Sequence, residues 1–199
     1  DSKADQSRGR DAILAVFLKV LNELQGYSSD HPHIAHMERY LDKKKQLDDF
    51  KREYRALTNE DWNDRRMDWQ FNQDAIIKAL AKVLDQSEQA CHRWIDHAET
   101  DFSLTVENFS RWVKEYLDTK GSSHRIFFFV DEVGQFIGSD GHLMLSLQTI
   151  VENLGVVCNG RAWIVVTSQE DIDTVLGSLS NARTNDFSKI QGRFKTRLS

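Results

Sequence analysis

The 199-residue chain contains one proline, two cysteines and no apolar run of membrane-spanning length. A helix that crosses a membrane needs about 20 mostly apolar residues, and the first ten residues, DSKADQSRGR, lack the apolar core of a secretory signal. Cys91 and Cys158 stand far apart without CxxC or Cys/His spacing, so neither a disulfide framework nor a zinc site is indicated. We therefore expect a cytoplasmic protein with no membrane partner and two buried thiols.

Neither sign of charge dominates the sequence. The chain has 26 basic and 31 acidic residues, a formal net charge of -5. This balance argues against a broad nucleic-acid-binding surface and leaves room only for a local basic groove. Three histidines lie in HPHIAH, at positions 31, 33 and 36, but no cysteine or carboxylate completes a ligand pattern around them, so we expect no metal site there.

The first 120 residues have helical apolar spacing throughout, and the scarcity of proline leaves little to interrupt it. Residues 11–24 carry apolar side chains around nearly the whole helix circumference, which predicts a helix buried on all sides and ended by Gly26. Residues 34–57 carry a narrow apolar stripe among many charges. That pattern predicts an exposed helical hairpin arm.

Two tryptophans and a long periodic segment follow. Trp62 and Trp69 lie one heptad apart with no regular basic interleaving, so packing is favoured over stacking on nucleic-acid bases. Residues 76–95 keep one helical apolar stripe, which predicts a single long amphipathic helix.

The periodicity changes after one more helix, which Ser103 or Thr105 can cap and Gly121 can end. Residues 126–130, IFFFV, and 162–166, AWIVV, are uninterrupted apolar runs bounded by polar residues. Such runs are typical of parallel strands buried on both faces.

A helical stripe at residues 143–154 separates the two strands, so strand, helix and strand form a crossover unit. We expect an α/β fold in which a largely α-helical region, 1–120, precedes an α/β part, 121–199. Two strands do not make a stable sheet covered on both sides. We therefore expect neighbouring strands outside this sequence, which would make it a segment of a larger protein.

Two carboxylates follow the first strand directly, at Asp131 and Glu132. Ligands of open parallel sheets bind outside the carboxyl ends of the strands. A nucleoside triphosphate brings Mg²⁺, which needs a carboxylate near its shell, and the attacking water needs an acceptor that orients it. The sequence therefore predicts a Walker B arrangement, with Asp131 bound to Mg²⁺ through water and Glu132 facing the attacking water. Two acids also follow a strand by chance at solvated strand ends, and the pair alone does not separate the two interpretations.

Polar residues also follow the second strand, at Thr167, Ser168 and Gln169. A polar side chain there can hydrogen-bond the attacking water or the γ-phosphate, as a sensor residue does. Ser168 also begins Ser-x-x-Asp, which is close to a capping box. Both interpretations hold together if Ser168 caps a helix while Thr167 or Gln169 faces the site.

Basic residues gather near the end of the sequence. Arg193 and Arg197 are four residues apart, and either could reach a phosphate in a neighbouring subunit, because guanidinium suits phosphoryl oxygens. A basic helix end or surface ion pairs explain them equally well. The phosphate-binding motif GxxxxGK[ST] does not occur in the chain, so the chain alone should bind ATP poorly or not at all.

The segment FFFVDEVGQFIGSDGHLMLSLQTIVENLGVVCNGRAWIVVTSQEDIDTVLG, followed by DFSKIQGRFKTRLS, resembles the BrxC (PglY-type) family of large P-loop ATPases of bacterial BREX phage-exclusion systems. The resemblance covers residues 125–199 and includes the Walker B strand, the sensor strand and the basic segment in order. Residues 1–120 look like the helical stretch that these proteins carry between the phosphate loop and Walker B, with less specific motifs.

The resemblance implies an AAA+-like P-loop ATPase core that uses ATP and Mg²⁺ in antiviral defence. It also implies assembly with other BREX proteins, including an adenine methyltransferase and a phosphatase-like protein. Carried over by position, it makes Asp131 the Mg²⁺-associated carboxylate, Glu132 the base, and Thr167 or Ser168 the sensor. The arginine finger would be Arg193 or Arg197.

The missing Walker A loop departs from the family pattern, so ATP hydrolysis is expected of the full-length protein and not of this segment alone. Two other functions stay open. The chain could be a protein-interaction module that uses the charged hairpin 34–57 and the tryptophan-bearing helices. It could also bind DNA through residues 189–197 or 43–55, by itself or within the complex, and a homo-oligomer is compatible with the sequence.

Overall fold

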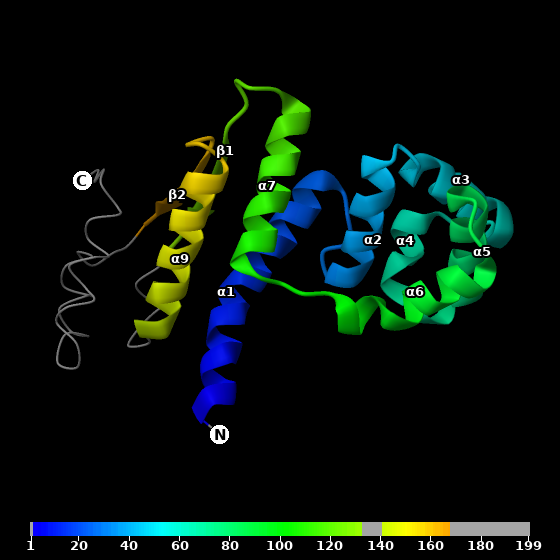
Figure 1. Ribbon diagram of the computed structural model, residues 1–199, viewed down its shortest axis with the longest axis horizontal. Coiled ribbons are helices and arrows are strands. Elements are labelled where there is room, and N and C mark those ends of the chain that lie inside the picture. Colours follow the sequence, from blue (N-terminus) through cyan, green and yellow to red (C-terminus); the bar gives the residue numbers. More distant parts are fainter. Residues whose placement is uncertain (1, 133–140, 168–199) are drawn as a thin grey trace. The chain divides into compact units, whose positions relative to one another are not determined.

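The computed structural model describes residues 2–132 and 141–167. In this part the chain is mostly helical and contains a parallel sheet of two strands, so the structure is mixed α/β (Figure 1). Contacts divide the chain into two compact units. We call residues 18–103 the helical unit, and residues 1–17 together with 104–199 the sheet unit. Helix α1, Ser2–Gln25, contributes residues to both.

The helical unit is built from short helices around an aromatic core. Its elements are α2 Pro32–Lys43, α3 Leu47–Thr58, α4 Trp62–Arg65, a 3₁₀ helix η1 Arg66–Phe71, α5 Gln73–Leu84 and α6 Glu88–Asp101. The Trp62 ring meets those of Phe50 and Tyr54 edge-on, with centroids 5.1 and 5.2 Å apart. Trp62 and Trp69 are both buried in this core, which confirms the packing interpretation.

Helices α2 and α3 confirm the helical hairpin, but the expectation of an exposed arm is wrong for its apolar side. Met37, Leu41, Phe50 and Tyr54 are buried, and α3 packs against α5. The charged residues that surround this narrow stripe are mostly on the solvent side. The stripe is therefore a core face of the helical unit.

The prediction of one helix over residues 76–95 is wrong, because the chain breaks between α5 and α6. Asp85 has a left-handed backbone with φ of 53°, and its N–H donates to the carbonyl of Ala81. Ser87 then caps α6, where its hydroxyl accepts from the N–H of Ala90 at 3.2 Å. A left-handed residue ends a helix locally without disturbing the apolar spacing on either side.

Helix α1 ends at Gln25, and Gly26, with φ of 76°, follows it as expected. The prediction that its apolar residues are buried on all sides is wrong. Leu14 and Leu21 are buried, whereas Val16, Val20 and Leu24 are about half exposed. These three lie four residues apart and so share one helix face, which the described residues do not cover.

The sheet unit contains α7 Val106–Lys120, β1 Ile126–Val130, α9 Gly141–Val157 and β2 Ala162–Val166. Thr105 caps α7 by accepting from the N–H of Asn108 at 3.1 Å, and Gly121 follows its last residue. The strands are parallel, in register from Ile126 opposite Ala162 to Val130 opposite Val166. The change from helix to strand falls after Gly121 as predicted, while the contacts group α7 with the sheet.

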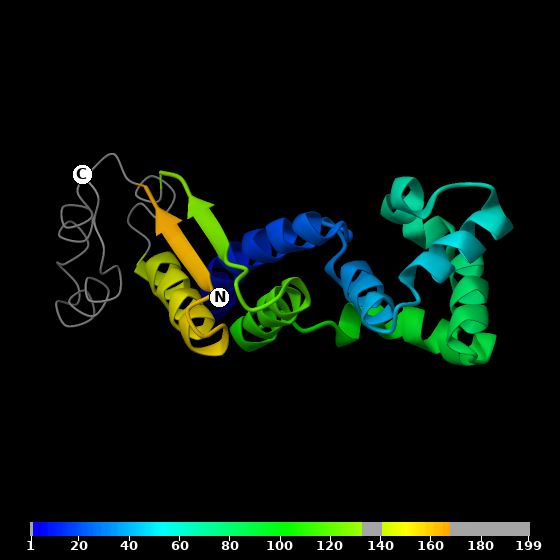
Figure 2. The ribbon, with the colours of Figure 1, turned by 90° about the horizontal axis from the view of Figure 1, so that it is seen from above.

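The two strands are covered on one face only. Phe128 packs against the rings of Phe17 and Phe109, with centroids 5.2 and 6.0 Å away. Figure 2 shows α1, α7 and α9 all on this side of the strands. The opposite face, which carries Phe127, Phe129, Trp163 and Val165, is exposed. The expectation of strands buried on both faces is therefore wrong for the part of the chain that the structure describes.

Both cysteines are free and buried, as expected, and burial raises the pKa of each thiol. Within residues 2–132 and 141–167, no helix is long and apolar enough to cross a membrane.

Candidate functional site

The ends of the two strands lie side by side. Val130 and Val166 are paired, and the N–H of Thr167 donates to the carbonyl of Val130 at 3.0 Å. Because the strands are parallel, the residues that follow them emerge at the same edge of the sheet. The structure thus brings together three of the predicted site residues, Asp131, Glu132 and Thr167.

Hydrogen bonds join these three residues. The hydroxyl of Thr167 donates to Oδ1 of Asp131 and accepts from the N–H of Glu132 at 3.0 Å. The same N–H also lies 3.1 Å from Oδ1 of Asp131. Thr167 therefore fixes the orientation of the Asp131 carboxylate. Both bonds to this carboxylate end on Oδ1, and Oδ2 takes part in neither.

Glu132 has an unusual backbone for its residue type, with φ of 50°. The left-handed region is uncommon for residues other than glycine, asparagine and aspartate. Backbone held in such sparsely populated conformations clusters at active sites and ligand clamps. This turn places the Glu132 N–H within reach of Thr167 and so ties the ends of the two strands together.

Oxygen atoms at the carboxyl ends of the two strands are accessible to solvent. Asp131 and Thr167 are exposed and Glu132 is half-buried. Carboxylate oxygens suit Mg²⁺, which commonly takes only one or two protein carboxylates and completes its shell with water and phosphate. Accordingly, Asp131 fits a Mg²⁺ site, although no cluster of three or more His, Cys, Asp or Glu residues that could hold a metal occurs among the described residues. Ser168, Gln169, Arg193 and Arg197 lie outside those residues.

The histidines of HPHIAH contact aromatic rings. His33 is buried, and its ring meets Trp69 edge-on with centroids 4.9 Å apart. Burial lowers the pKa of His33, which favours the neutral ring. His36 lies edge-on to Phe102 at 6.0 Å.

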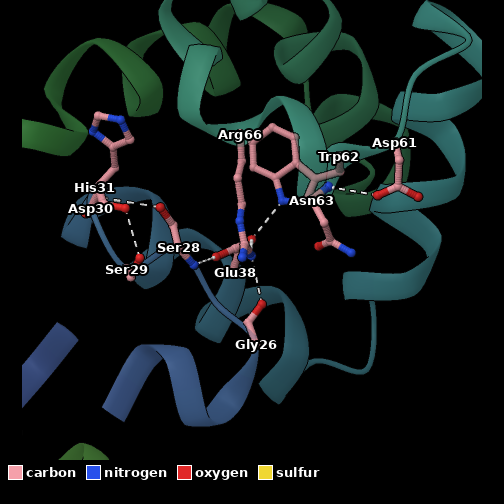
Figure 3. Close-up of polar contacts among 10 residues, drawn as sticks. All are labelled: Gly26, Ser28, Ser29, Asp30, His31, Glu38, Asp61, Trp62, Asn63 and Arg66. Carbon is pink, nitrogen blue, oxygen red and sulfur yellow. Dashed lines mark hydrogen bonds and ion pairs between the residues drawn. The ribbon is translucent and has the colours of Figure 1, made fainter. Parts of the chain in front are cut away.

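A buried polar cluster in the helical unit was not predicted from the sequence (Figure 3). Glu38 has no exposed surface. Its carboxylate accepts from the N–H of Ser28 at 2.6 Å, from Trp62 Nε1 at 2.7 Å and from Arg66 Nη1 at 3.1 Å. Arg66 also donates to the carbonyl of Gly26 at 2.7 Å. The cluster thus connects α2 to the loop after α1 and to the segment that contains α4 and η1.

No protein-family model matches the chain, and no solved structure matches it.

Proposed function

We propose that this chain carries the hydrolytic half of a P-loop nucleoside triphosphatase site. The observation that supports this proposal is the hydrogen-bonded group of Asp131, Glu132 and Thr167 at the carboxyl ends of two adjacent parallel strands. Parallel α/β sheets bind ligands at this edge. Two neighbouring carboxylates and a hydroxyl supply an oxygen for Mg²⁺, an acceptor for water and a group that holds the geometry.

Each residue has a separate role in this proposal. The carboxylate of Asp131 would hold Mg²⁺ through water, and the ion, when bound, would offset phosphate charge. Glu132 orients the attacking water and accepts its proton. Thr167 acts as a positioning residue, because its hydroxyl already bridges Asp131 and the Glu132 N–H. Ser168 as a second sensor candidate and Arg193 or Arg197 as the arginine finger are retained as proposals from the sequence.

The phosphate-binding loop is assigned to residues outside this chain, because GxxxxGK[ST] does not occur in its 199 residues. Together with the sequence resemblance, this leads us to propose an ATPase of a cytoplasmic BREX defence complex, with the methyltransferase and the phosphatase-like protein as partners.

The test is Glu132→Gln in the full-length protein. Because the amide cannot accept the proton of water, we expect ATP turnover to fall by about 10²- to 10⁴-fold, while ATP binding stays close to that of the wild type. Glu107→Gln is the matched control, since Glu107 is an exposed carboxylate in the first turn of α7. Unchanged hydrolysis in Glu132→Gln would contradict the proposal.

The two alternative functions have weaker support. An interaction module that uses Trp62 and Trp69 would need accessible rings, but both side chains are buried in the core. DNA binding through residues 43–55 is disfavoured because Asp48, Asp49 and Glu53 lie among the basic residues of that segment. Neither alternative gives a reason for the grouping of Asp131, Glu132 and Thr167.

A further inference from the structure

A small cavity lies between helices α2 and α6 of the helical unit, with a volume of about 110 Å³. Two aromatic side chains at its wall, Trp94 and Phe102, are half-buried, and Asp101 at its rim is exposed. The cavity therefore extends from the core of the helical unit to its surface. Its buried apolar lining belongs to the core and consists of Ile34, Met37 and Ile95.

The volume suits the end group of a ligand and not a whole molecule. A water molecule occupies about 30 Å³ in the liquid, so the cavity has the volume of roughly three or four waters. Sites for drug-sized ligands typically measure about 300–1,000 Å³. The occupant is therefore a group of about four or five non-hydrogen atoms, and the remainder of the ligand lies outside the cavity.

The rings beside the cavity are suited to a positive charge. The faces of aromatic rings attract cations that lie within about 6 Å of the ring centroid, and tryptophan does so best. The ring of Trp94 lies edge-on to Tyr40 at 5.4 Å between centroids, and that of Phe102 lies edge-on to His36 at 6.0 Å. These contacts fix the positions of the Trp94 and Phe102 rings. Because burial favours the neutral form of His33, which also lines the cavity, that ring does not repel a cation.

Asp101 brings a negative charge to the cavity at a position where the charge does not stabilise the helix. It is the last residue of α6, whose last turn also contains Glu99 and no basic residue. The helix dipole favours cations at this end and disfavours anions. A positively charged ligand in the cavity gives these acids a favourable interaction that the helix itself does not provide.

We propose that this cavity binds a trimethylammonium group, with Trp94 and Phe102 contacting its methyl groups and Asp101 balancing its charge. A primary ammonium is strongly hydrated and carries three donors, whereas a quaternary group needs no hydrogen-bond acceptor. Among the described side chains that line the cavity, strong acceptors are limited to Asp101 and two histidines. An uncharged apolar group would fill the same volume but would gain nothing from the carboxylate. The site belongs to the helical unit and does not depend on the proposed nucleotide site.

Titration of the 199-residue chain with choline tests the group, followed by ¹H–¹⁵N NMR at pH 8, where a histidine of ordinary pKa, about 6.5, is neutral. We expect saturable shifts of the amides of Trp94, Ala98 and Phe102, with a dissociation constant below about 10 mM. The control ligand is 3,3-dimethyl-1-butanol, which has the shape of choline with carbon in place of the charged nitrogen. We expect it to bind at least about tenfold more weakly. Equal affinities, or no saturable shifts at these residues, would overturn the inference.

The variant Asp101→Asn tests the charge at the rim. We expect choline to bind about three- to fivefold more weakly, while the affinity for the neutral alcohol stays the same. Removing a negative charge from the end of α6 does not weaken the helix, so the variant should remain folded. Asp96→Asn is the matched control, because Asp96 is an exposed carboxylate of α6 outside the cavity that pairs with His92 at 2.6 Å. An equal loss in both variants, or no loss in Asp101→Asn, would contradict the assignment.

The part of the ligand outside the cavity distinguishes its source. The capped amino acid N-acetyl-Nε-trimethyl-lysine amide presents the same group on a side chain, as a modified partner protein would. Tighter binding of this compound than of choline assigns the site to a methylated protein, and the reverse order assigns it to a free small molecule. If both bind more weakly than the neutral alcohol, the cavity does not recognise the trimethylammonium group.

Discussion

Glu38 is a charged residue with no exposed surface, and three donors from different segments converge on it. We expect Glu38→Ala to lower the free energy of unfolding of the 199-residue chain by about 3–5 kcal/mol. The change removes the acceptor of the Ser28 and Trp62 N–H groups and leaves Arg66 with the carbonyl of Gly26 in place of a carboxylate. Urea denaturation followed by tryptophan fluorescence measures the effect.

The matched control for Glu38 is Glu53→Ala, which removes a carboxylate paired with Lys82 at the surface at 2.6 Å. Surface ion pairs contribute little, so we expect a loss below about 1 kcal/mol. Equal losses in the two variants would show that the buried cluster does not stabilise the helical unit more than an ordinary surface pair does.

Tyr27 is buried and donates to Oδ2 of Asp42 at 2.5 Å. Burial, followed by this hydrogen bond, raises the pKa of Tyr27 above its usual value. The unfolded chain releases the phenol proton near pH 10, while the folded chain retains it. The resulting stabilisation is complete below about pH 10 and is lost as pH rises towards the folded-state pKa.

We therefore expect the free energy of unfolding to fall more steeply between about pH 9 and 11 in the wild type than in Tyr27→Phe. Urea midpoints measured across this range provide the comparison. Parallel pH profiles would mean that the phenol titrates alike in the folded and unfolded chains.

Single residues also show what the sequence could predict. Asp131, Glu132 and Thr167 were predicted together, because an uninterrupted apolar run locates the end of a strand and parallel strands share an edge. Glu38 was missed, although it lies four residues after Ile34 and three before Leu41 and so shares their buried face. Its partner Arg66 is distant in sequence, and sequence spacing does not reveal such pairs.

At the scale of elements, the two faces of β1 differ, because one packs against other elements and the other is exposed. Phe128 is 7% exposed and contacts Phe17 and Phe109, whereas Phe129 is 75% exposed. In the 199-residue chain we expect Phe128→Ala to lower the free energy of unfolding by about 3–5 kcal/mol, through lost burial and the cavity it leaves. Phe129→Ala, the control with the same chemical change, should stay within about 0.5 kcal/mol. Equal losses, measured by urea denaturation, would contradict the one-sided sheet.

Some features of the helices and strands could be predicted from the sequence, and others could not. The order of helices and strands and the parallel pairing followed from apolar periodicity, because that signal extends over whole elements. The break between α5 and α6 did not, since it depends on one residue, Asp85, in a left-handed conformation that no spacing announces. The exposed face of α1 at Val16, Val20 and Leu24 also escaped prediction. Apolar residues show that a helix face is suited to burial, but only the tertiary contacts show whether that face is buried.

At the scale of the whole molecule, the described sheet has only two strands, although apolar side chains on both of its faces are typical of a larger sheet. Two parallel strands with apolar side chains on both faces normally belong to a larger sheet, and here one face and the outer edge of β2 lack a described partner. The same chain carries carboxylates and a hydroxyl at the strand ends but no phosphate-binding sequence.

If the phosphate-binding loop lies outside this chain, the chain alone should bind nucleotide weakly. Phosphate-binding loops hold the triphosphate through backbone N–H groups and a lysine, and this supplies much of the affinity. The sheet edge, in contrast, presents the carboxylates of Asp131 and Glu132, which repel phosphate in the absence of Mg²⁺. We expect isothermal titration of the 199-residue chain with Mg·ATP to give no binding at micromolar concentrations, whereas the full-length protein, titrated as the control, binds. A micromolar dissociation constant for the chain alone would mean that the phosphates are held by residues within it, and the assignment of the loop to a segment outside this sequence would then be wrong.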